Sequence, residues 1–159
     1  MTLASGLVDL GILRGDPIAL AADGVVALLF PHGVGHLLGL DVHDMEDLGD
    51  RAGYGPGRER SKEFGLRSLR LDRDLLPGMA VTIEPGLYQV TSILQDAALT
   101  RVAGDRLDRQ KLAAFADVRG IRIEDDVLVT ETGREILTEA IPKSIAAVES
   151  AIGQTADAA

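Results

Sequence analysis

The sequence predicts an α+β fold, with a curved and mainly antiparallel sheet and with helices packed on its outer face. Three strand-like segments carry this prediction, residues 32–44, 79–90 and 120–130. Helical patterns flank these segments at both ends of the chain, where apolar residues recur at the spacing of one helix face. Strands grouped between helical ends are typical of α+β domains.

Composition limits the classes of protein that the chain can represent. Its 159 residues suit one domain of ordinary size, and 46% hydrophobic with 26% charged residues is the globular mixture. The chain has no cysteine, which excludes disulfides, thiolate metal sites and a cysteine nucleophile. No apolar run approaches the roughly 20 residues of a membrane span, and no signal peptide is visible. We therefore expect a cytoplasmic protein that is not embedded in a membrane.

The balance of charge argues against nucleic acid as a partner. Acidic residues outnumber basic ones by 25 to 16, a formal net charge of −9, and only 3% of residues are aromatic. Such a chain repels phosphates and offers few rings on which bases could stack. Residues 51–80 are locally basic, and a solvated polar loop is the simpler explanation of this segment. Contact with an anion or a protein partner is the alternative.

The N-terminal region is expected to be helical. In the first fifteen residues, leucine and isoleucine side chains share one face before a glycine ends the pattern. Asp16 and Pro17 are typical of an N-cap and of the first position of a second helix. We expect this second helix to continue to about Phe30, since a proline follows.

The middle of the chain is expected to be extended and then irregular. Residues 32–44 hold three glycines and three histidines and make a poor helix, so an extended segment is favoured. Residues 45–66 are rich in glycine and charge and predict a long surface loop. Residues 79–83 form a buried strand pattern, which a Pro-Gly pair interrupts before residues 87–90 resume it.

The last third combines a surface insertion, a hairpin and a helix. Residues 91–118 are weakly helical and are expected to lie over the surface as an insertion. Residues 120–130 alternate well and predict one continuous strand, with residues 135–137 as its hairpin partner. A final helix is expected from Pro142, and a frayed tail at 154–159.

All the histidines of the chain fall in one short stretch, as His32, His36 and His43. The four-residue spacing of the first two does not place them on a helix, because Gly33 and Gly35 lie between them. The zinc-binding helix motif H-E-x-x-H is therefore excluded. Taken alone, these histidines fit a functional site and ordinary backbone-bonded histidines about equally well.

Two glutamates lie in apolar strand patterns, Glu84 at a strand end and Glu124 between two isoleucines. A carboxylate in such a setting is costly unless it is paired or bound to a metal. The simpler explanations are a strand-end salt bridge for Glu84 and an ion pair with Arg122 for Glu124. With one histidine on a third strand, they would instead form a carboxylate-rich site suited to Mn²⁺, Co²⁺ or Zn²⁺. A non-haem iron site with two histidines and one carboxylate is a weaker third alternative.

Three segments carry a resemblance to a known family. They are FPHGVGHLLGLDVHD (30–44), TIEPGLY (82–88) and GIRIEDDVLVT (120–130). In order and wording they are similar to the three C-terminal motifs of Xaa-Pro aminopeptidases, the proline-specific branch of the pita-bread metallopeptidases. The resemblance implies that residues 1–153 form the C-terminal half of a pita-bread catalytic domain.

The resemblance also implies a ligand set. Members of this family hold two metal ions with two Asp, one His and two Glu, and Mn²⁺ is the metal that we expect. His36 would be the metal-binding histidine, Glu84 a second ligand that also shuttles the proton to the leaving proline nitrogen, and Glu124 the bridging carboxylate. The family's two Asp ligands have no counterpart in this sequence, because Gly53-Tyr54-Gly55 is not followed by Asp.

Four further residues receive roles through the same resemblance. His43 would lie beside the substrate and stabilise the tetrahedral intermediate. His32 would line the pocket for the proline side of the scissile bond. Arg122 and Tyr88 would orient the carboxylates.

The leading hypothesis is therefore a partial Xaa-Pro aminopeptidase that releases an N-terminal residue preceding proline. A peptide with proline at its second position is the expected substrate, and a missing N-terminal half or a second copy is a possible protein partner. With three of five ligands, we expect the chain alone to be far less active than a full-length relative. The alternative is a non-catalytic peptide-binding or interaction module on a half pita-bread fold.

Overall fold

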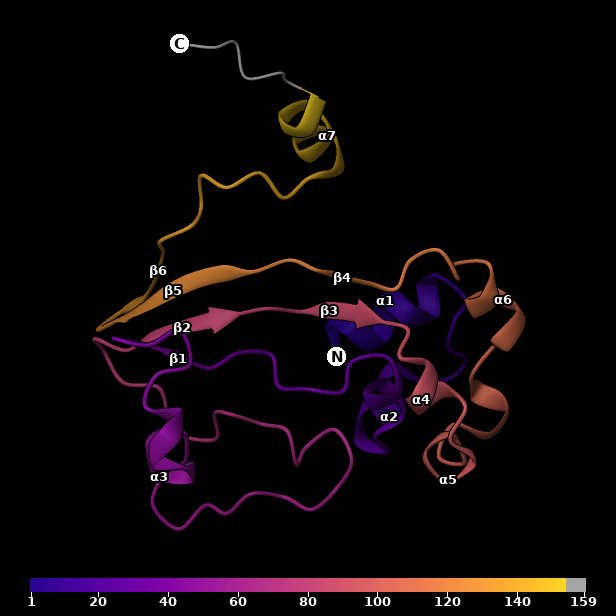
Figure 1. Cartoon of the computed structure of the whole chain (residues 1–159), viewed down its shortest axis with the longest axis horizontal. Coiled ribbons are helices and arrows are strands. Elements are labelled where there is room, and N and C mark those ends of the chain that lie inside the picture. Colours follow the sequence, from indigo (N-terminus) through magenta and orange to yellow (C-terminus); the bar gives the residue numbers. More distant parts are fainter. Residues whose placement is uncertain (154–159) are drawn as a thin grey trace.

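The fold is organised around a four-stranded antiparallel sheet, seen in a computed structural model that describes residues 1–153 (Figure 1). The strand order is β1-β2-β5-β6, and a two-stranded sheet, β3-β4, lies beyond β2 and β5. The α+β class and the antiparallel sheet agree with the prediction. The strand bounds are β1 Leu37–Leu38, β2 Ala80–Ile83, β3 Gly86–Tyr88, β4 Gly120–Arg122, β5 Asp125–Thr130 and β6 Gly133–Ile136.

Most helices are short and gather beyond the β3-β4 end of the sheet (Figure 1). None of the helices within residues 1–153 is long and apolar enough to cross a membrane. The α-helices are α1 Thr2–Asp9, α2 Pro17–Ala22, α3 Asp50–Gly53, α4 Thr91–Leu94, α5 Ala97–Thr100, α6 Arg109–Ala113 and α7 Ile145–Gly153. The 3₁₀ helices are η1 Val25–Leu28, η2 Glu46–Leu48 and η3 Gly104–Arg106.

The two sheets are parts of one paired ribbon. Ile83 lies opposite Asp125 in the β2-β5 ladder, and Gly86 lies opposite Arg122 in the β3-β4 ladder. These pairs have the same register, so β2 continues into β3 and β4 continues into β5. The ribbon is therefore two long antiparallel strands with one shared interruption.

That interruption falls at Pro85, which has no backbone N–H to donate to a ladder. Its carbonyl still accepts a hydrogen bond from the N–H of Ile123 at 3.1 Å. The continuous strand expected over residues 120–130 is therefore wrong, because the break divides it into β4 and β5. Glu84 and Glu124 lie at the break, opposite each other.

The chain before β1 also runs along β2. The N–H of Thr82 donates to the carbonyl of His36 at 2.9 Å, and that of Glu84 donates to the carbonyl of Val34 at 2.7 Å. Gly35 makes this approach possible, since a Cβ there would lie 1.9 Å from the carbonyl oxygen of Thr82. Close backbone contact is thus the reason for glycine at this position.

A buried apolar cluster joins the N-terminal helices to the helices that follow β3. The expectation that residues 91–118 form a surface insertion is wrong, because this segment supplies part of the cluster. Its buried members are Leu7, Ile12, Leu13, Leu20, Val25, Leu28, Leu29, Ala103, Leu107 and Leu112.

The predicted helices are present but shorter than expected. Asp16 caps α2 through a 2.9 Å hydrogen bond from the N–H of Ala19 to its side chain, as predicted. The helix then ends at Ala22, because Gly24 takes a left-handed conformation with φ 75° before η1 begins. The last helix begins at Ile145 rather than at Pro142. The predicted frayed tail lies outside the described residues.

The segment after β6 is tied back to the start of β5 through Asp125. Lys143 Nζ lies 2.9 Å from the Asp125 carboxylate, and the Thr138 hydroxyl donates to the same oxygen at 2.7 Å. These contacts, that of Lys143 first, lower the pKa of Asp125. They hold the residue next to Glu124 in place.

Gly35→Ala tests the close approach of the chain to β2. We expect the free energy of unfolding to fall by about 2 kcal/mol or more, because a methyl group cannot occupy the space of a carbonyl oxygen. Urea unfolding curves measure this change. Gly133→Ala is the matched control, since no atom lies within 4 Å of a Cβ built there. Equal stabilities of the two variants would contradict this account of Gly35.

Candidate metal centre

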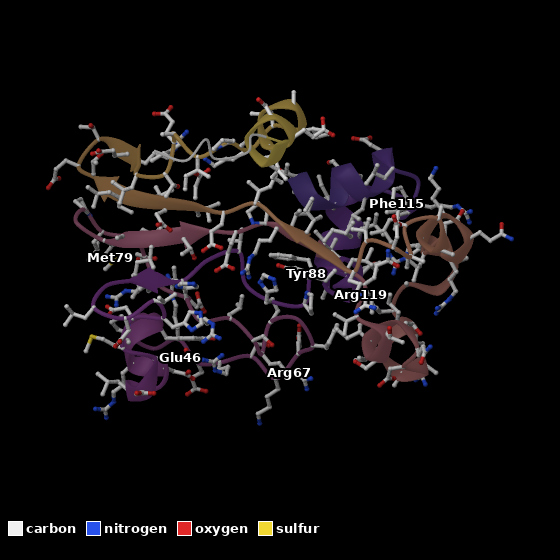
Figure 2. All side chains as sticks on the ribbon, turned by 45° about the horizontal axis from the view of Figure 1, so that its top comes forward. Glu46, Arg67, Met79, Tyr88, Phe115 and Arg119 are labelled. Atoms are coloured by element: carbon white, nitrogen blue, oxygen red, sulfur yellow. The ribbon has the colours of Figure 1, made fainter. Side chains whose placement is uncertain are left out.

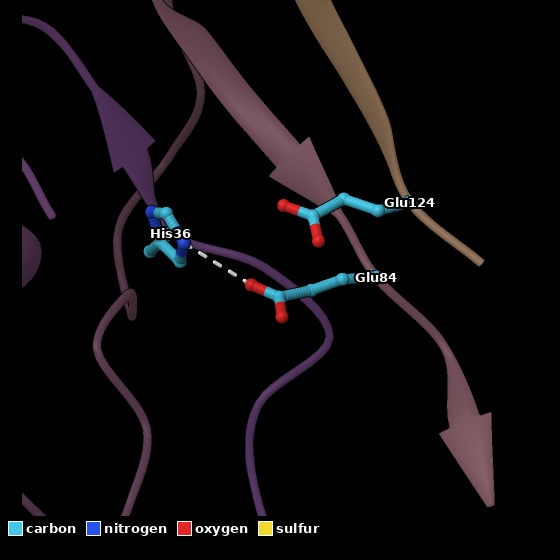
Figure 3. A group of neighbouring side chains, drawn as sticks. All are labelled: His36, Glu84 and Glu124. Carbon is cyan, nitrogen blue, oxygen red and sulfur yellow. Dashed lines mark ion pairs between the residues drawn. The ribbon is translucent and has the colours of Figure 1, made fainter. Parts of the chain in front are cut away.

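Three potential metal ligands converge where the ribbon is interrupted. Each of His36, Glu84 and Glu124 offers one ligand atom, and these atoms all lie within 4.8 Å of one another (Figure 3). His36 and Glu84 are 6% and 7% exposed, whereas Glu124 is more open to solvent. The segments before β1, after β2 and before β5 thus each supply one residue to the cluster.

Strand register explains why these side chains meet. Extending the β2-β5 register by one residue places Glu84 directly opposite Glu124. Extending the β1-β2 register in the same way places His36 opposite Thr82, which shares a sheet face with Glu84. Like charges directly opposite each other destabilise a sheet. The pair of glutamates is therefore costly unless positive charge lies beside it.

The ring of His36 is oriented as in a metal-binding histidine. Its Nδ1 hydrogen-bonds to the carbonyl oxygen of Leu37 at 2.9 Å, so Nδ1 carries the proton of the neutral ring. The lone pair of Nε2 then faces Glu84 Oε1 at 3.2 Å (Figure 3). Two acceptor atoms at this distance repel each other unless a proton or a cation lies between them. The donor set therefore fits a divalent cation.

Thr82 connects two of the three ligands and was not predicted from the sequence. Its side chain is buried, and its hydroxyl donates to Glu84 Oε1 at 3.0 Å. The same hydroxyl accepts a hydrogen bond from the backbone N–H of His36, also at 3.0 Å. Its position two residues before Glu84, on the same face of the strand, was the signal in the sequence.

Arg122 supplies positive charge to both glutamates. Its Nη1 lies 2.9 Å from Glu84 Oε2, and its Nε lies 3.5 Å from Glu124 Oε2. The salt bridges that the sequence offered as simpler explanations are therefore present. They are compatible with a metal site, because the contacts of Arg122 are with Oε2 of each glutamate, whereas His36 Nε2 lies beside Oε1 of Glu84.

The remaining histidines lie on the wall of the same site. His32, His36 and His43 line a cavity of about 400 Å³ together with Glu84 and Arg122. The ring of His43 meets that of His36 edge-on, with 4.6 Å between the ring centroids. Of the residues that the sequence placed at one site, the structure thus brings together the three histidines, the two glutamates and Arg122.

Tyr88 takes a different place from the predicted one. The ring of Tyr88 (Figure 2) packs edge-on against that of His32, with 5.1 Å between the ring centroids. The ring of Phe30 lies 4.4 Å from that of His32 and 6.4 Å from that of Tyr88, so the three rings neighbour one another. Among the described residues the hydroxyl of Tyr88 has no hydrogen-bond partner, so it contacts neither glutamate. Tyr88 belongs to an aromatic wall and does not hold the carboxylates in this structure.

Two other sequence-based alternatives can be compared with the structure. In the locally basic segment, Arg58, Arg60 and Arg70 pair with acidic side chains, which favours the polar-loop explanation. The ligand cluster found among residues 1–153 has one imidazole and two carboxylates. A non-haem iron triad needs two imidazoles and one carboxylate, so the composition of the cluster disfavours it.

Comparisons with known proteins agree with this geometry. The profile of metallopeptidase family M24 matches residues 11–131. Human Xaa-Pro dipeptidase is 42% identical over 144 residues, covering 91% of this chain and 28% of the human protein. A probable Xaa-Pro aminopeptidase of Penicillium rubens is 41% identical over 145 residues, covering 91% of this chain and 29% of the fungal one.

Solved structures give the same result. The aminopeptidase PepP of Pseudomonas aeruginosa superposes with a TM-score of 0.59 at 35% identity, covering 92% of this chain and 26% of that one. Aminopeptidase P from E. coli with the inhibitor Pro-Leu gives a TM-score of 0.56 at 36% identity, covering 93% and 26%. The chain therefore spans less than a third of the length of these relatives.

Thr82→Val tests the link between the ligands. Valine has nearly the same shape but no hydroxyl, so Glu84 loses a donor and the N–H of His36 loses its acceptor. We expect the affinity for Mn²⁺, measured by isothermal titration calorimetry, to fall about 10- to 100-fold, as is usual when an outer hydrogen bond to a ligand is removed. Thr82→Ser keeps the hydroxyl and should bind as the unchanged chain does. Equal affinities for the valine and serine variants would rule out this role.

Proposed function

The chain belongs to metallopeptidase family M24, and we propose that it forms part of a metal-dependent peptidase that releases an N-terminal residue preceding proline. The convergence of His36, Glu84 and Glu124, at a cavity that His36 and Glu84 line, is the observation that carries the proposal. Relatives named Xaa-Pro dipeptidase and Xaa-Pro aminopeptidase support the substrate class. A peptide with proline at its second position is therefore the proposed substrate.

The proposed cofactor is a divalent cation, and Mn²⁺ suits a site with two carboxylates and one imidazole. When bound, such a cation supplies a nucleophilic water at neutral pH and polarises the peptide carbonyl. The two further Asp ligands implied by the family resemblance have no counterpart in this sequence. We propose that an N-terminal half, which is not part of this sequence, supplies them.

The residues at and beside the cavity would have separate roles in the reaction. Glu84, buried beside His36, would take a proton and pass it to the leaving proline nitrogen. Glu124 would help His36 and Glu84 to hold the cation, and Arg122 would hold both carboxylates through their Oε2 atoms. His43 would donate a hydrogen bond to the carbonyl oxygen as negative charge develops there.

The aromatic wall would hold the proline side of the substrate. His32 packs against Phe30 and Tyr88, with ring centroids 4.4 and 5.1 Å away. Its Nε2 has no hydrogen-bond partner among the described residues. A flat apolar surface with one free polar atom is complementary to a proline ring with its adjoining carbonyl. The cytoplasmic location stays a prediction.

A non-catalytic peptide-binding module is the second candidate. The observation that favours it is the ligand count, because this sequence holds three of the five expected ligands. Three ligands bind one cation weakly, and two close cations repel each other without a second bridging carboxylate. The two candidates share a cavity and differ in turnover.

Peptide release separates the candidates. We expect the chain alone, with excess Mn²⁺, to cleave an Xaa-Pro tripeptide at least about 100-fold more slowly than a full-length relative. Loss of a residue that only hydrogen-bonds to a metal ligand already lowers metal affinity or activity about 10- to 100-fold, and here two ligands themselves are absent. Adding the N-terminal half of a relative should raise the rate. Comparing an Xaa-Pro dipeptide with the tripeptide then distinguishes dipeptidase from aminopeptidase activity.

Glu124→Gln is the control, because it keeps the size of the side chain and removes its charge. Fast turnover by the chain alone that disappears in this variant would show that the two aspartates are not needed. No turnover after addition of the N-terminal half would favour the binding module.

A further inference from the structure

Glu46 lies outside the group of metal ligands, on the side of the sheet near α3 (Figure 2). It is the first residue of η2 and follows Met45, whose φ of 54° is the only positive value at a non-glycine position within residues 1–153. Such backbone costs about 1 kcal/mol or more and persists where the surrounding contacts hold it. This turn brings Glu46 back towards His43.

The two carboxylate oxygens of Glu46 have different partners. Oε2 lies 3.2 Å from His43 Nδ1, and Oε1 pairs with Arg70 Nη1. Both partners line the metal cavity, where they accompany His36 and Glu84. Glu46 and the same two partners also line a neighbouring cavity of about 170 Å³. Glu46 therefore approaches the wall of the metal cavity from behind.

This contact determines how the ring of His43 is presented. A nitrogen 3.2 Å from a carboxylate oxygen must carry a proton for the contact to be favourable. Nδ1 is therefore the protonated position, and the opposite edge of the ring, with Nε2, faces away from Glu46. Arg70 comes from a different segment and anchors the carboxylate, so that Glu46 cannot follow the ring if the ring turns.

We propose that Glu46 is a positioning residue, which fixes the rotamer and tautomer of His43 at the wall of the metal cavity. The inference deepens the proposed peptidase function, on which the role of His43 at the substrate carbonyl rests. In His36, a backbone carbonyl fixes the tautomer in the same way, at 2.9 Å from Nδ1. In His43, the side chain of Glu46 accepts from Nδ1 instead, so a single substitution can remove this contact.

The test is ¹⁵N NMR of the imidazoles, which is tractable because the chain has three histidines. Spectra at about pH 8, where an ordinary imidazole is neutral, separate the two tautomers. In Glu46→Gln we expect the His43 signal to move towards the Nε2–H tautomer. The affinity for Mn²⁺ should stay within about threefold, because Glu46 contacts none of the three ligands.

Asp47→Asn is the matched control. Asp47 is the next residue of η2, is exposed, and forms no ion pair within residues 1–153. This variant loses the same charge and should leave the His43 signal unchanged. If Glu46→Gln does not fold, Glu46→Asp replaces it, since the shorter side chain cannot reach both partners and should shift the His43 signal in the same direction.

Kinetics supply the second readout. In the chain completed by the N-terminal half of a relative, Glu46→Gln should lower kcat about 10-fold with KM within about threefold, as expected for a residue that acts through another. An unchanged His43 spectrum in Glu46→Gln would overturn the proposal, and so would a loss of Mn²⁺ binding as large as that in Glu84→Gln. If the unchanged chain shows no turnover, the peptidase function fails, while the NMR comparison still decides the role of Glu46.

Discussion

Two negative charges stand opposite each other where the long ribbon of strands is interrupted, and much of the surrounding structure compensates for them. Glu84 and Glu124 are held in register by β2 and β5, so neither can withdraw without breaking the sheet. Opposed like charges are unfavourable on a sheet, and burial of Glu84 strengthens the effect. Arg122 compensates part of the charge through its contacts with Oε2 of both glutamates. One oxygen of each glutamate and one ring nitrogen of His36 lie within 4.8 Å of one another.

The residues around the two glutamates are held in fixed positions. The ligands come from strand ends, whose positions are set by backbone hydrogen bonds. The hydroxyl of Thr82 connects His36 and Glu84 through two hydrogen bonds. His43 is held from the loop that follows β1, where Glu46 and Arg70 meet. The candidate ligands thus lie at strand ends, whereas His43 lies on a loop. This division suits a hydrolytic metal site, in which ligand geometry must stay fixed while the substrate enters.

Features that depend on local pattern could be predicted from the sequence. Apolar patterns identified the strands around residues 79–83 and 120–130 and a hairpin partner after the second of them. The cost of a carboxylate in an apolar strand pointed to Glu84 and Glu124 before any contact was known. The break at Glu124 was missed because its cause, Pro85, lies on the partner strand. The helices between residues 91 and 118 are too short to show helical periodicity, so their place in the core was not visible. The contact of Glu46 with His43 depends on a left-handed turn at Met45, a residue type that gives no such signal.

Anomalous diffraction tests the central claim most directly, with crystals of the chain grown with Mn²⁺ and data collected at the manganese edge. The account predicts a peak with His36 Nε2 and one oxygen each of Glu84 and Glu124 within about 2.0–2.3 Å. Arg122 should keep its contacts with Oε2 of both glutamates in the same map. A map without a peak at this point, with the two glutamates held by Arg122 alone, would contradict the claim that their opposition exists to bind a cation.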